Sequence, residues 1–274
     1  MVMEMKEIKI VLCDLDGTLL NSEKIITPKT KEAIHKLRKQ GIMFGIATGR
    51  TLAGVRKRII EWGIQEDCDI LMGFNGGMYD DYPLNRFGNA YLLTPQAVKE
   101  ALEDYCAKFQ ITAGVFDGDI YYVQEDNQYA KKIAGNNGLA KEVSDLSKYK
   151  EEGCNKILGM ADPEVIDAIE KYVKENPPQY FRGVRSQPIL FEFINPELSK
   201  TKGIEIIAGN HDLTLENVLV FGDELNDFEM IRDCGVGVCM SNGNPKVKEI
   251  ADYVTDYSND EDGIADFIEK HLLK

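Results

Sequence analysis

The first fifty residues alternate short apolar runs with one amphipathic helical pattern, joined by tight connections. Residues 8–13 form an apolar run suited to a buried strand. Thr27 and Pro28 are typical of a helix N-cap and first helical position, and Gly41 ends the pattern. A second apolar run, residues 42–47, follows at once. Strand, helix and strand in this order form a βαβ unit, which requires parallel strands and a right-handed crossover.

The same alternation continues along the chain and returns near its end. We expect a helix over residues 52–62 and a third strand over 70–74, closed by turn-forming residues at 75–77. Towards the C-terminus the expected elements are a helix at 202–208, a strand at 218–221, a helix at 226–232 and a strand at 236–239. Both parts of the chain are therefore predicted to build one Rossmann-like α/β core around a parallel sheet.

The middle of the chain has a different pattern. Residues 112–116 and 120–123 flank an Asp-Gly-Asp turn, which indicates a hairpin of antiparallel strands. Further elements are expected as strands at 155–160, 180–185 and 189–194 and as a helix beginning at 162–163. We interpret residues 83–188 as an inserted α+β domain and residues 1–82 and 189–274 as the core that it interrupts. Linkers between the two are expected near 82–84 and 187–189.

Charge and cysteine content disfavour several classes of protein. Asp and Glu number 46 against 32 Lys and Arg, and the net charge of −14 disfavours nucleic acid as a partner. No stretch approaches the roughly 18 apolar residues of a membrane span, and residues 1–9 lack the apolar core of a secretory signal. The six cysteines form no CxxC pair and the three histidines lie far apart. We expect a protein of the reducing cytoplasm, without a membrane partner, whose chemistry depends on carboxylates.

Carboxylates follow two of the predicted core strands. Asp14 and Asp16 come directly after the first strand, and residues two apart in extended chain point to the same side. Ligands of open α/β sheets bind at the carboxyl ends of the strands, where Thr48 and Asp223 are also expected. If these strands are neighbours, the carboxylates, with that of Asp227, repel one another unless a cation compensates. Ligation by oxygen alone favours magnesium or another hard divalent ion.

A hard cation, a carboxylate nucleophile, a threonine hydroxyl and a lysine together suit phosphoryl transfer. Two lysines, Lys200 and Lys202, lie where the core pattern resumes after the insertion. We prefer Lys202, because Gly203 follows it and a helix is expected to begin there. Lys200 remains the alternative.

Four segments of the chain resemble the motifs of haloacid dehalogenase superfamily phosphatases. They are Asp-Leu-Asp-Gly-Thr-Leu-Leu at 14–20, Ala-Thr-Gly-Arg at 47–50, Lys-Gly at 202–203 and Gly-Asp-Glu-Leu-Asn-Asp at 222–227. The segments 237–243, 247–255 and 259–263 further resemble the Cof-like subgroup, which carries a large α/β cap of the C2 type (class IIB). Cys13 departs from the pattern, since the family usually has an aromatic residue there.

The resemblance implies a role for each matched residue. Asp14 attacks phosphorus and becomes an aspartyl phosphate, while Asp16 protonates the leaving oxygen and then activates water. Thr48 and Lys202 hold phosphoryl oxygens. Mg²⁺ is held by the Asp14 and Asp223 carboxylates and the Asp16 main-chain carbonyl. The supporting residues are Asp227, Asn226 and Gly49.

The predicted function is a magnesium-dependent phosphatase acting on small phosphorylated metabolites such as sugar phosphates or phosphorylated cofactors. One alternative is a phosphomutase, which returns the phosphoryl group to a sugar instead of to water. Another is a receiver-like regulatory module, although Asp16 argues against the long-lived phosphoaspartate that a receiver needs. The metabolite itself and the oligomeric state are not predicted, although a monomer is compatible with the sequence.

Overall fold

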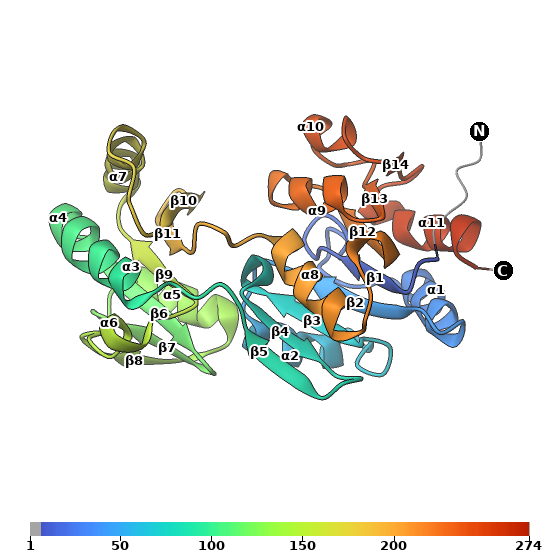
Figure 1. Ribbon diagram of the computed structural model, residues 1–274, viewed down its shortest axis with the longest axis horizontal. Coiled ribbons are helices and arrows are strands. Elements are labelled where there is room, and N and C mark those ends of the chain that lie inside the picture. Colours follow the sequence, from blue (N-terminus) through green and yellow to red (C-terminus); the bar gives the residue numbers. More distant parts are fainter. Residues whose placement is uncertain (1–6, 274) are drawn as a thin grey trace. The chain divides into compact units, whose positions relative to one another are not determined.

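The computed structural model of the protein describes residues 7–273 (Figure 1). The interpretation of residues 1–9 therefore lies largely outside the described residues. The described chain divides into two compact units. The first combines the residues before Asn89 with those after Leu198, and the second is Asn89–Leu198.

The first unit is built on an eight-stranded sheet in the order β14-β13-β12-β1-β2-β3-β4-β5. Its strands are β1 (Ile10–Cys13), β2 (Met43–Ala47), β3 (Ile70–Gly73), β4 (Met78–Asp81), β5 (Arg86–Asn89), β12 (Val218–Gly222), β13 (Val236–Cys239) and β14 (Tyr253–Val254). All pairs from β14 to β3 are parallel, whereas β4 runs antiparallel to β3. The carboxyl ends of β1, β2 and β12 therefore meet at one edge.

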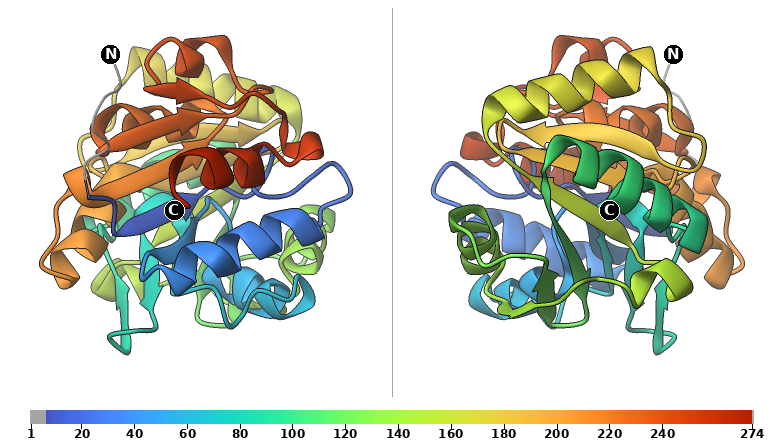
Figure 2. Two further views of the ribbon diagram at one scale, coloured as in Figure 1. Left: turned by 90° about the vertical axis from the view of Figure 1, so that its right-hand side faces the viewer. Right: turned by 90° about the vertical axis from the view of Figure 1, so that its left-hand side faces the viewer.

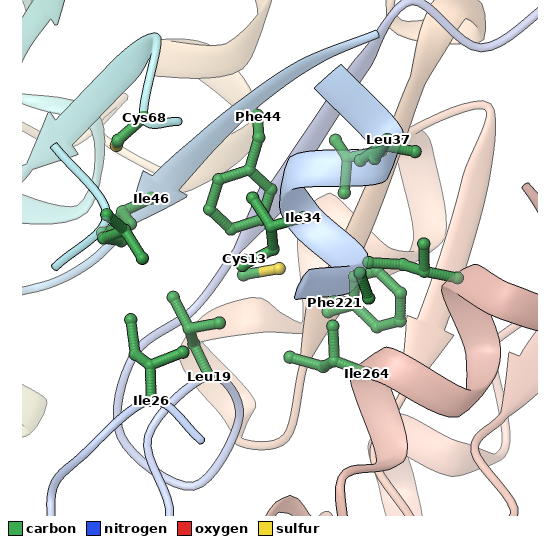
Figure 3. Packing of buried hydrophobic residues seen from close by; sticks show 14 of the residues in the cluster. Cys13, Leu19, Ile26, Ile34, Leu37, Phe44, Ile46, Cys68, Phe221 and Ile264 are labelled. Atoms are coloured by element: carbon green, nitrogen blue, oxygen red, sulfur yellow. The ribbon is translucent and has the colours of Figure 1, made fainter. Parts of the chain in front are cut away.

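Helices cover both faces of this sheet. They are α1 (Pro28–Lys39), α2 (Leu52–Glu61), α8 (Lys200–Asn210), α9 (Phe228–Asp233), α10 (Pro245–Lys248) and α11 (Gly263–His271). Helices α1 and α11 lie side by side on one face, as Figure 2 (left) shows. They share an apolar cluster with α2, in which Cys13, Ile34, Phe44, Ile46 and Ile264 point toward one another (Figure 3). Helices α8 and α9 pack in a second cluster on the other face.

The sequence of β1 explains why both faces are covered. Val11 and Cys13 belong to the cluster with α1, while Ile10 and Leu12 belong to the cluster with α8. Successive side chains of a strand point to opposite faces, so a strand that is apolar throughout needs a helical layer on each side. The predicted class, a Rossmann-like parallel-sheet core with an inserted α+β domain, is confirmed.

The second unit contains a six-stranded sheet in the order β10-β11-β9-β6-β7-β8. Its strands are β6 (Thr112–Asp117), β7 (Ile120–Val123), β8 (Ala140–Val143), β9 (Lys156–Met160), β10 (Arg182–Gln187) and β11 (Leu190–Ile194). Its helices are α3 (Pro95–Lys99), which continues through a π-helical stretch (Glu100–Cys106) into α4 (Ala107–Phe109), and α5 (Gln128–Asn137), α6 (Tyr149–Glu152) and α7 (Pro163–Glu175). All pairs are antiparallel except β7 with β8. The α3–α4 helix and α7 lie on one face (Figure 2, right).

The borders of the insertion differ from the predicted 83 and 188. Residues 83–88 belong to the first unit, because β4 continues through a turn at Tyr82–Asn85 into β5. Residues 189–198 belong to the second unit, because β11 forms a hairpin with β10 and pairs with β9. The two expected linkers are thus hairpin turns. In the described part of the chain, no helix has the length and apolar character needed to cross a bilayer.

Candidate active site

Asp14 lies at the carboxyl end of β1, where the chain leaves the sheet. Its backbone N–H donates to Phe221 on β12, and its carbonyl accepts from Leu19, which closes a tight turn. Within this turn Gly17 has φ +85°, a conformation that favours glycine. A Cβ at Gly17 would lie 2.4 Å from Oδ2 of Asp223, so the turn packs its backbone directly against that carboxylate.

The structure places Lys200, and not Lys202, against Asp14. Nζ of Lys200 donates to Oδ1 of Asp14 and to Oδ1 of Asp227, each at 2.5 Å, and Lys200 is buried. Lys202 is exposed and pairs with Glu205 at 2.8 Å. The predicted placement of Lys202 is therefore wrong. Residues two apart on a helix diverge by about 200°, so only one of the two lysines can face the sheet edge.

Two features fix α8 so that Lys200 faces inward. Ser199 accepts from the Lys202 N–H and caps the helix, so α8 begins two residues earlier than predicted. Gly203 packs against Gly76 in the 3₁₀ turn (Phe74–Gly76) that follows β3, where a Cβ on Gly203 would lie 2.6 Å from the Gly76 Cα. The glycine that favoured Lys202 in the sequence thus serves helix packing instead.

Asp223 and Asp227 follow β12 and lie beside Asp14. Carboxylate oxygens of the three residues lie within 4.8 Å of one another. The Thr18 hydroxyl donates to Oδ1 of Asp223 at 2.6 Å. Asp227 is fully buried, and its Oδ2 accepts from the N–H groups of Asp223 and Glu224 at 2.9 and 3.1 Å. The Asp227 carboxylate therefore binds Lys200 and the backbone that follows β12. The Asp223 carboxylate, by contrast, accepts a hydrogen bond from the Thr18 hydroxyl.

The electrostatics of this cluster reflect burial and crowding. Burial, assisted by the charges of Asp227 and Asp223 and opposed by Lys200, raises the pKa of Asp14 to about 7. Burial likewise raises the pKa of Asp223 to about 6, with Asp227 and Glu224 contributing and Thr18 opposing. Burial would lower the pKa of Lys200, but Asp14 and Asp227 raise it above its ordinary value. The lysine thus stays charged among acids that are costly to ionise.

The oxygen donors of this cluster fit a hard divalent cation. Mg²⁺ prefers one or two carboxylates with other oxygen ligands, and Asp14 and Asp223 supply two carboxylates without a competing nitrogen or sulfur ligand. A divalent charge also relieves the repulsion that, after burial, contributes to the raised pKa of both groups. Asp227 is less suited to ligation, since its oxygens already accept from Lys200 and two backbone N–H groups.

Thr48, Gly49 and Asn226 come together around Asn75. Thr48 follows β2, the neighbour of β1, and its buried Oγ1 accepts from the Arg50 N–H at 3.2 Å. The Asn75 N–H donates to the Thr48 carbonyl, and a Cβ on Gly49 would lie 3.2 Å from the Asn75 side chain. Asn226 donates to Oδ1 of Asn75 at 3.5 Å. Thr51, and not Thr48, caps α2, so Thr48 remains at the sheet edge.

Asp16 lies in a more open position than Asp14. Its carboxylate accepts two hydrogen bonds from Arg50, at 2.9 and 2.7 Å, and a third from Lys24 at 3.0 Å. Partial burial would raise the pKa of Asp16, but Arg50 and then Lys24 lower it below its ordinary value. The role of Lys24 was not predicted, because nothing in the sequence indicates that the chain turns back there.

Sequence reasoning also missed Thr18 and preferred the wrong lysine. Thr18 was noted only as part of the first motif. The signal for Lys200 was present in the helical pattern: Ile204 and Ile207 are buried on α8, and Lys200 precedes them by four and seven residues, on the same face. Lys202 does not share that spacing.

The chain is similar to known proteins over nearly its whole length. Residues 11–268 match the model of the haloacid dehalogenase-like hydrolase family. The 5-amino-6-(5-phospho-D-ribitylamino)uracil phosphatase YitU of Bacillus subtilis is 30% identical over 275 residues, covering 98% of this chain and 99% of that protein. A haloacid dehalogenase-like hydrolase from Bacteroides thetaiotaomicron has a crystal structure with 27% identity and a TM-score of 0.83, covering 96% of this chain and 99% of that one. A sugar phosphatase of HAD subclass IIB has a TM-score of 0.79 at 24% identity, covering 97% and 100%.

A parallel-sheet core interrupted by an α+β insertion, in a chain whose similar proteins are named hydrolases and phosphatases, identifies a hydrolase with a Cof-like domain arrangement. The chain belongs to the haloacid dehalogenase-like hydrolase family, and it is a phosphatase.

Proposed function

We propose that this phosphatase hydrolyses small phosphorylated metabolites in a magnesium-dependent reaction through an aspartyl phosphate on Asp14. The observation that carries the proposal is the position of Asp14: it ends β1, contacts buried Lys200 and lies within ligand distance of Asp223. A carboxylate so placed can attack phosphorus while positive charge neutralises the phosphoryl oxygens.

The proposed reaction has two steps. A carboxylate oxygen of Asp14 forms a bond to phosphorus as the bond to the leaving oxygen breaks, and Asp16 gives that oxygen a proton. Asp16 then removes a proton from water, which attacks phosphorus, so that inorganic phosphate leaves and Asp14 is restored.

Other residues hold the phosphoryl group. Lys200 replaces Lys202 in the proposal, and its ammonium, with Thr48 at the end of β2, contacts phosphoryl oxygens. Mg²⁺ would be held by the Asp14 and Asp223 carboxylates and the Asp16 main-chain carbonyl, and it would neutralise negative charge on the phosphoryl group. Asp227, Asn226 and Gly49 support the site through the contacts described above.

The names of similar proteins guide the choice of substrates. The Bacillus relative is named for a phosphorylated ribityl compound, and a protein of like fold is named a sugar phosphatase. We infer that phosphate monoesters of sugars, sugar alcohols and cofactor precursors are the substrate class. The six cysteines, all free and buried, support the expectation of a reducing cytoplasm.

The test is release of inorganic phosphate from a panel of such esters, with magnesium and with chelator. Wild-type protein, Asp14→Asn and, as a control, Asp256→Asn on the surface are compared. Metal-dependent release that is lost only in Asp14→Asn supports the proposal. Full activity of Asp14→Asn would refute the role of Asp14 as the nucleophile. If no ester releases phosphate but one sugar phosphate is converted into its isomer, the result would favour a phosphomutase.

A further inference from the structure

We propose that Lys24 and Arg50 are positioning residues that hold the Asp16 carboxylate as the base that takes a proton from water, and that the segment Asn259–Asp262 fixes the loop that carries Lys24. The proposal rests on the function proposed above, in which Asp16 activates water for hydrolysis of the aspartyl phosphate.

The first step concerns Arg50. Its guanidinium makes a bidentate pair with Asp16, Nε to Oδ2 at 2.9 Å and Nη2 to Oδ1 at 2.7 Å. Its backbone is fixed on both sides, because its N–H donates to Thr48 and its carbonyl accepts from Phe74. A planar guanidinium on a fixed backbone restrains both the place and the orientation of a carboxylate.

Lys24 approaches Asp16 from a loop whose backbone is also held by hydrogen bonds. The Lys24 ammonium donates to Oδ1 of Asp16 at 3.0 Å. Its N–H donates to the Asn21 carbonyl, and its carbonyl accepts from the indole N–H of Trp62 at 3.1 Å. Lys24 has φ +62°, an uncommon conformation for a residue with a side chain, which these contacts maintain.

The segment Asn259–Asp262, more than 230 residues further along the chain, holds the preceding part of this loop. Oδ1 of Asp260 accepts from the Ser22 N–H at 2.6 Å and Oδ2 from its hydroxyl at 2.7 Å. Asn259 donates to the Leu20 carbonyl at 2.8 Å. Together these bonds set the path of the loop between Asp16 and Lys24.

These contacts do more for orientation than for stability. The side chains of Lys24 and Asp16 are 58% and 44% exposed, and exposed ion pairs contribute little to the free energy of unfolding. Removal of Lys24 should therefore leave the fold intact, and a loss of activity would report on Asp16.

The test separates the two steps with p-nitrophenyl phosphate, whose leaving phenolate needs no proton. Release of p-nitrophenolate in a single turnover reports the attack by Asp14, whereas the steady-state rate also requires water to hydrolyse the aspartyl phosphate. General acid–base catalysis is worth roughly 10²–10⁴ in rate, so we expect Lys24→Met and Arg50→Met each to lower the steady-state kcat about tenfold or more. The single-turnover release of p-nitrophenolate should change less than about twofold, and Lys24→Arg should restore kcat.

Control variants separate the positioning of Asp16 from general effects of removing a surface charge. Lys36→Met removes a lysine from another exposed pair, with Glu32 on α1, and should match wild type. Asp260→Ala should give a smaller loss of the same selective kind, whereas Asp256→Asn should not. Wild-type rates in Lys24→Met and Arg50→Met, an equal loss of the single-turnover and the steady-state rate, or a gain in kcat would overturn the positioning role. An Asp260→Ala variant equal to wild type would overturn the role of the segment.

Failure of this inference is distinguishable from failure of the proposed function. If wild type releases phosphate and Asp14→Asn does not, the proposed function holds whatever the Lys24 variants do. If Asp14→Asn is as active as wild type, the proposed function fails first.

Discussion

At the scale of single residues, two lysines in the first turn of α8 meet opposite environments. Lys200 is buried between Asp14 and Asp227, and Lys202 lies in solvent with Glu205. The sequence motif contains both, and local spacing to the glycine favoured the wrong one. The side chain that reaches the site is decided by helix register, which depends on the cap at Ser199 and on buried Ile204.

The two lysines give a direct prediction. Lys200→Met should lower kcat/KM by about 10²–10³-fold, because a charge on the phosphoryl oxygens is lost. It should also lower the free energy of unfolding by about 3 kcal/mol, since it leaves buried carboxylates without their cation. Lys202→Met should keep kcat/KM within twofold of wild type. Steady-state kinetics measures the rates and urea unfolding measures the stability of both variants. A larger loss of activity in Lys202→Met than in Lys200→Met would restore Lys202 to the site.

Gly17 gives a second prediction at this scale. Gly17→Ala should cost about 1–2 kcal/mol of stability, because φ is +85°, and should also displace Asp223, which a Cβ would meet at 2.4 Å. Gly118→Ala is the matched control, since Gly118 also has positive φ but nothing within 4 Å. We expect similar losses of stability in thermal unfolding and a loss of magnesium-dependent activity in Gly17→Ala alone. Equal activity in the two variants would contradict the role of this close contact.

At the scale of elements, the core strands and helices could be predicted because apolar periodicity and caps are local signals. The short strands β4, β5 and β8 could not, since Met78–Asp81 and Ala140–Val143 are polar and carry no clear alternation. The sequence predicts strand β11 but assigns it to the wrong unit, because an apolar run does not reveal which sheet it joins. In the structure β11 pairs with β9 and therefore belongs to the sheet of the second unit.

Helix α8 depends on a close approach that a single methyl group should disturb. Gly203→Ala would bring a Cβ to 2.5 Å from the sulfur of Met72 and 2.6 Å from the Gly76 Cα. We expect a loss of about 1–3 kcal/mol and, because Lys200 moves with the helix, reduced kcat. Gly209→Ala near the other end of α8 meets nothing within 4 Å and should stabilise the protein by about 0.5 kcal/mol. Unchanged activity in Gly203→Ala would show that Lys200 tolerates the shift.

At the scale of the whole molecule, the carboxylate cluster makes global stability depend on pH. In the metal-free protein the pKa values of Asp14 and Asp223 are raised to about 7 and about 6. Below about pH 4 both groups are protonated in the folded and unfolded states alike. Between about pH 4 and 7 the unfolded chain releases protons that the folded protein keeps, so their contribution is lost over this range, and above it the fold must hold both charges.

Magnesium should reverse this loss. Because a cation binds the ionised carboxylates, the difference in Tm between magnesium and chelator should be small at about pH 5 and larger at about pH 8. Thermal unfolding at several pH values measures it. Asp223→Asn should reduce the difference at high pH, while Asp256→Asn should not. A difference that does not vary with pH would mean that the cation binds elsewhere.

Trp62 is the single tryptophan of the chain, and its indole N–H donates to the Lys24 carbonyl. Indole emission responds to the hydrogen bond at this nitrogen and to the polarity around the ring. The intrinsic fluorescence of the protein is thus an optical reporter of the Lys24 loop that needs no label. A stopped-flow trace after mixing with vanadate or a phosphate ester would test in real time whether that loop shifts when the site fills, separately from chemistry at Asp14.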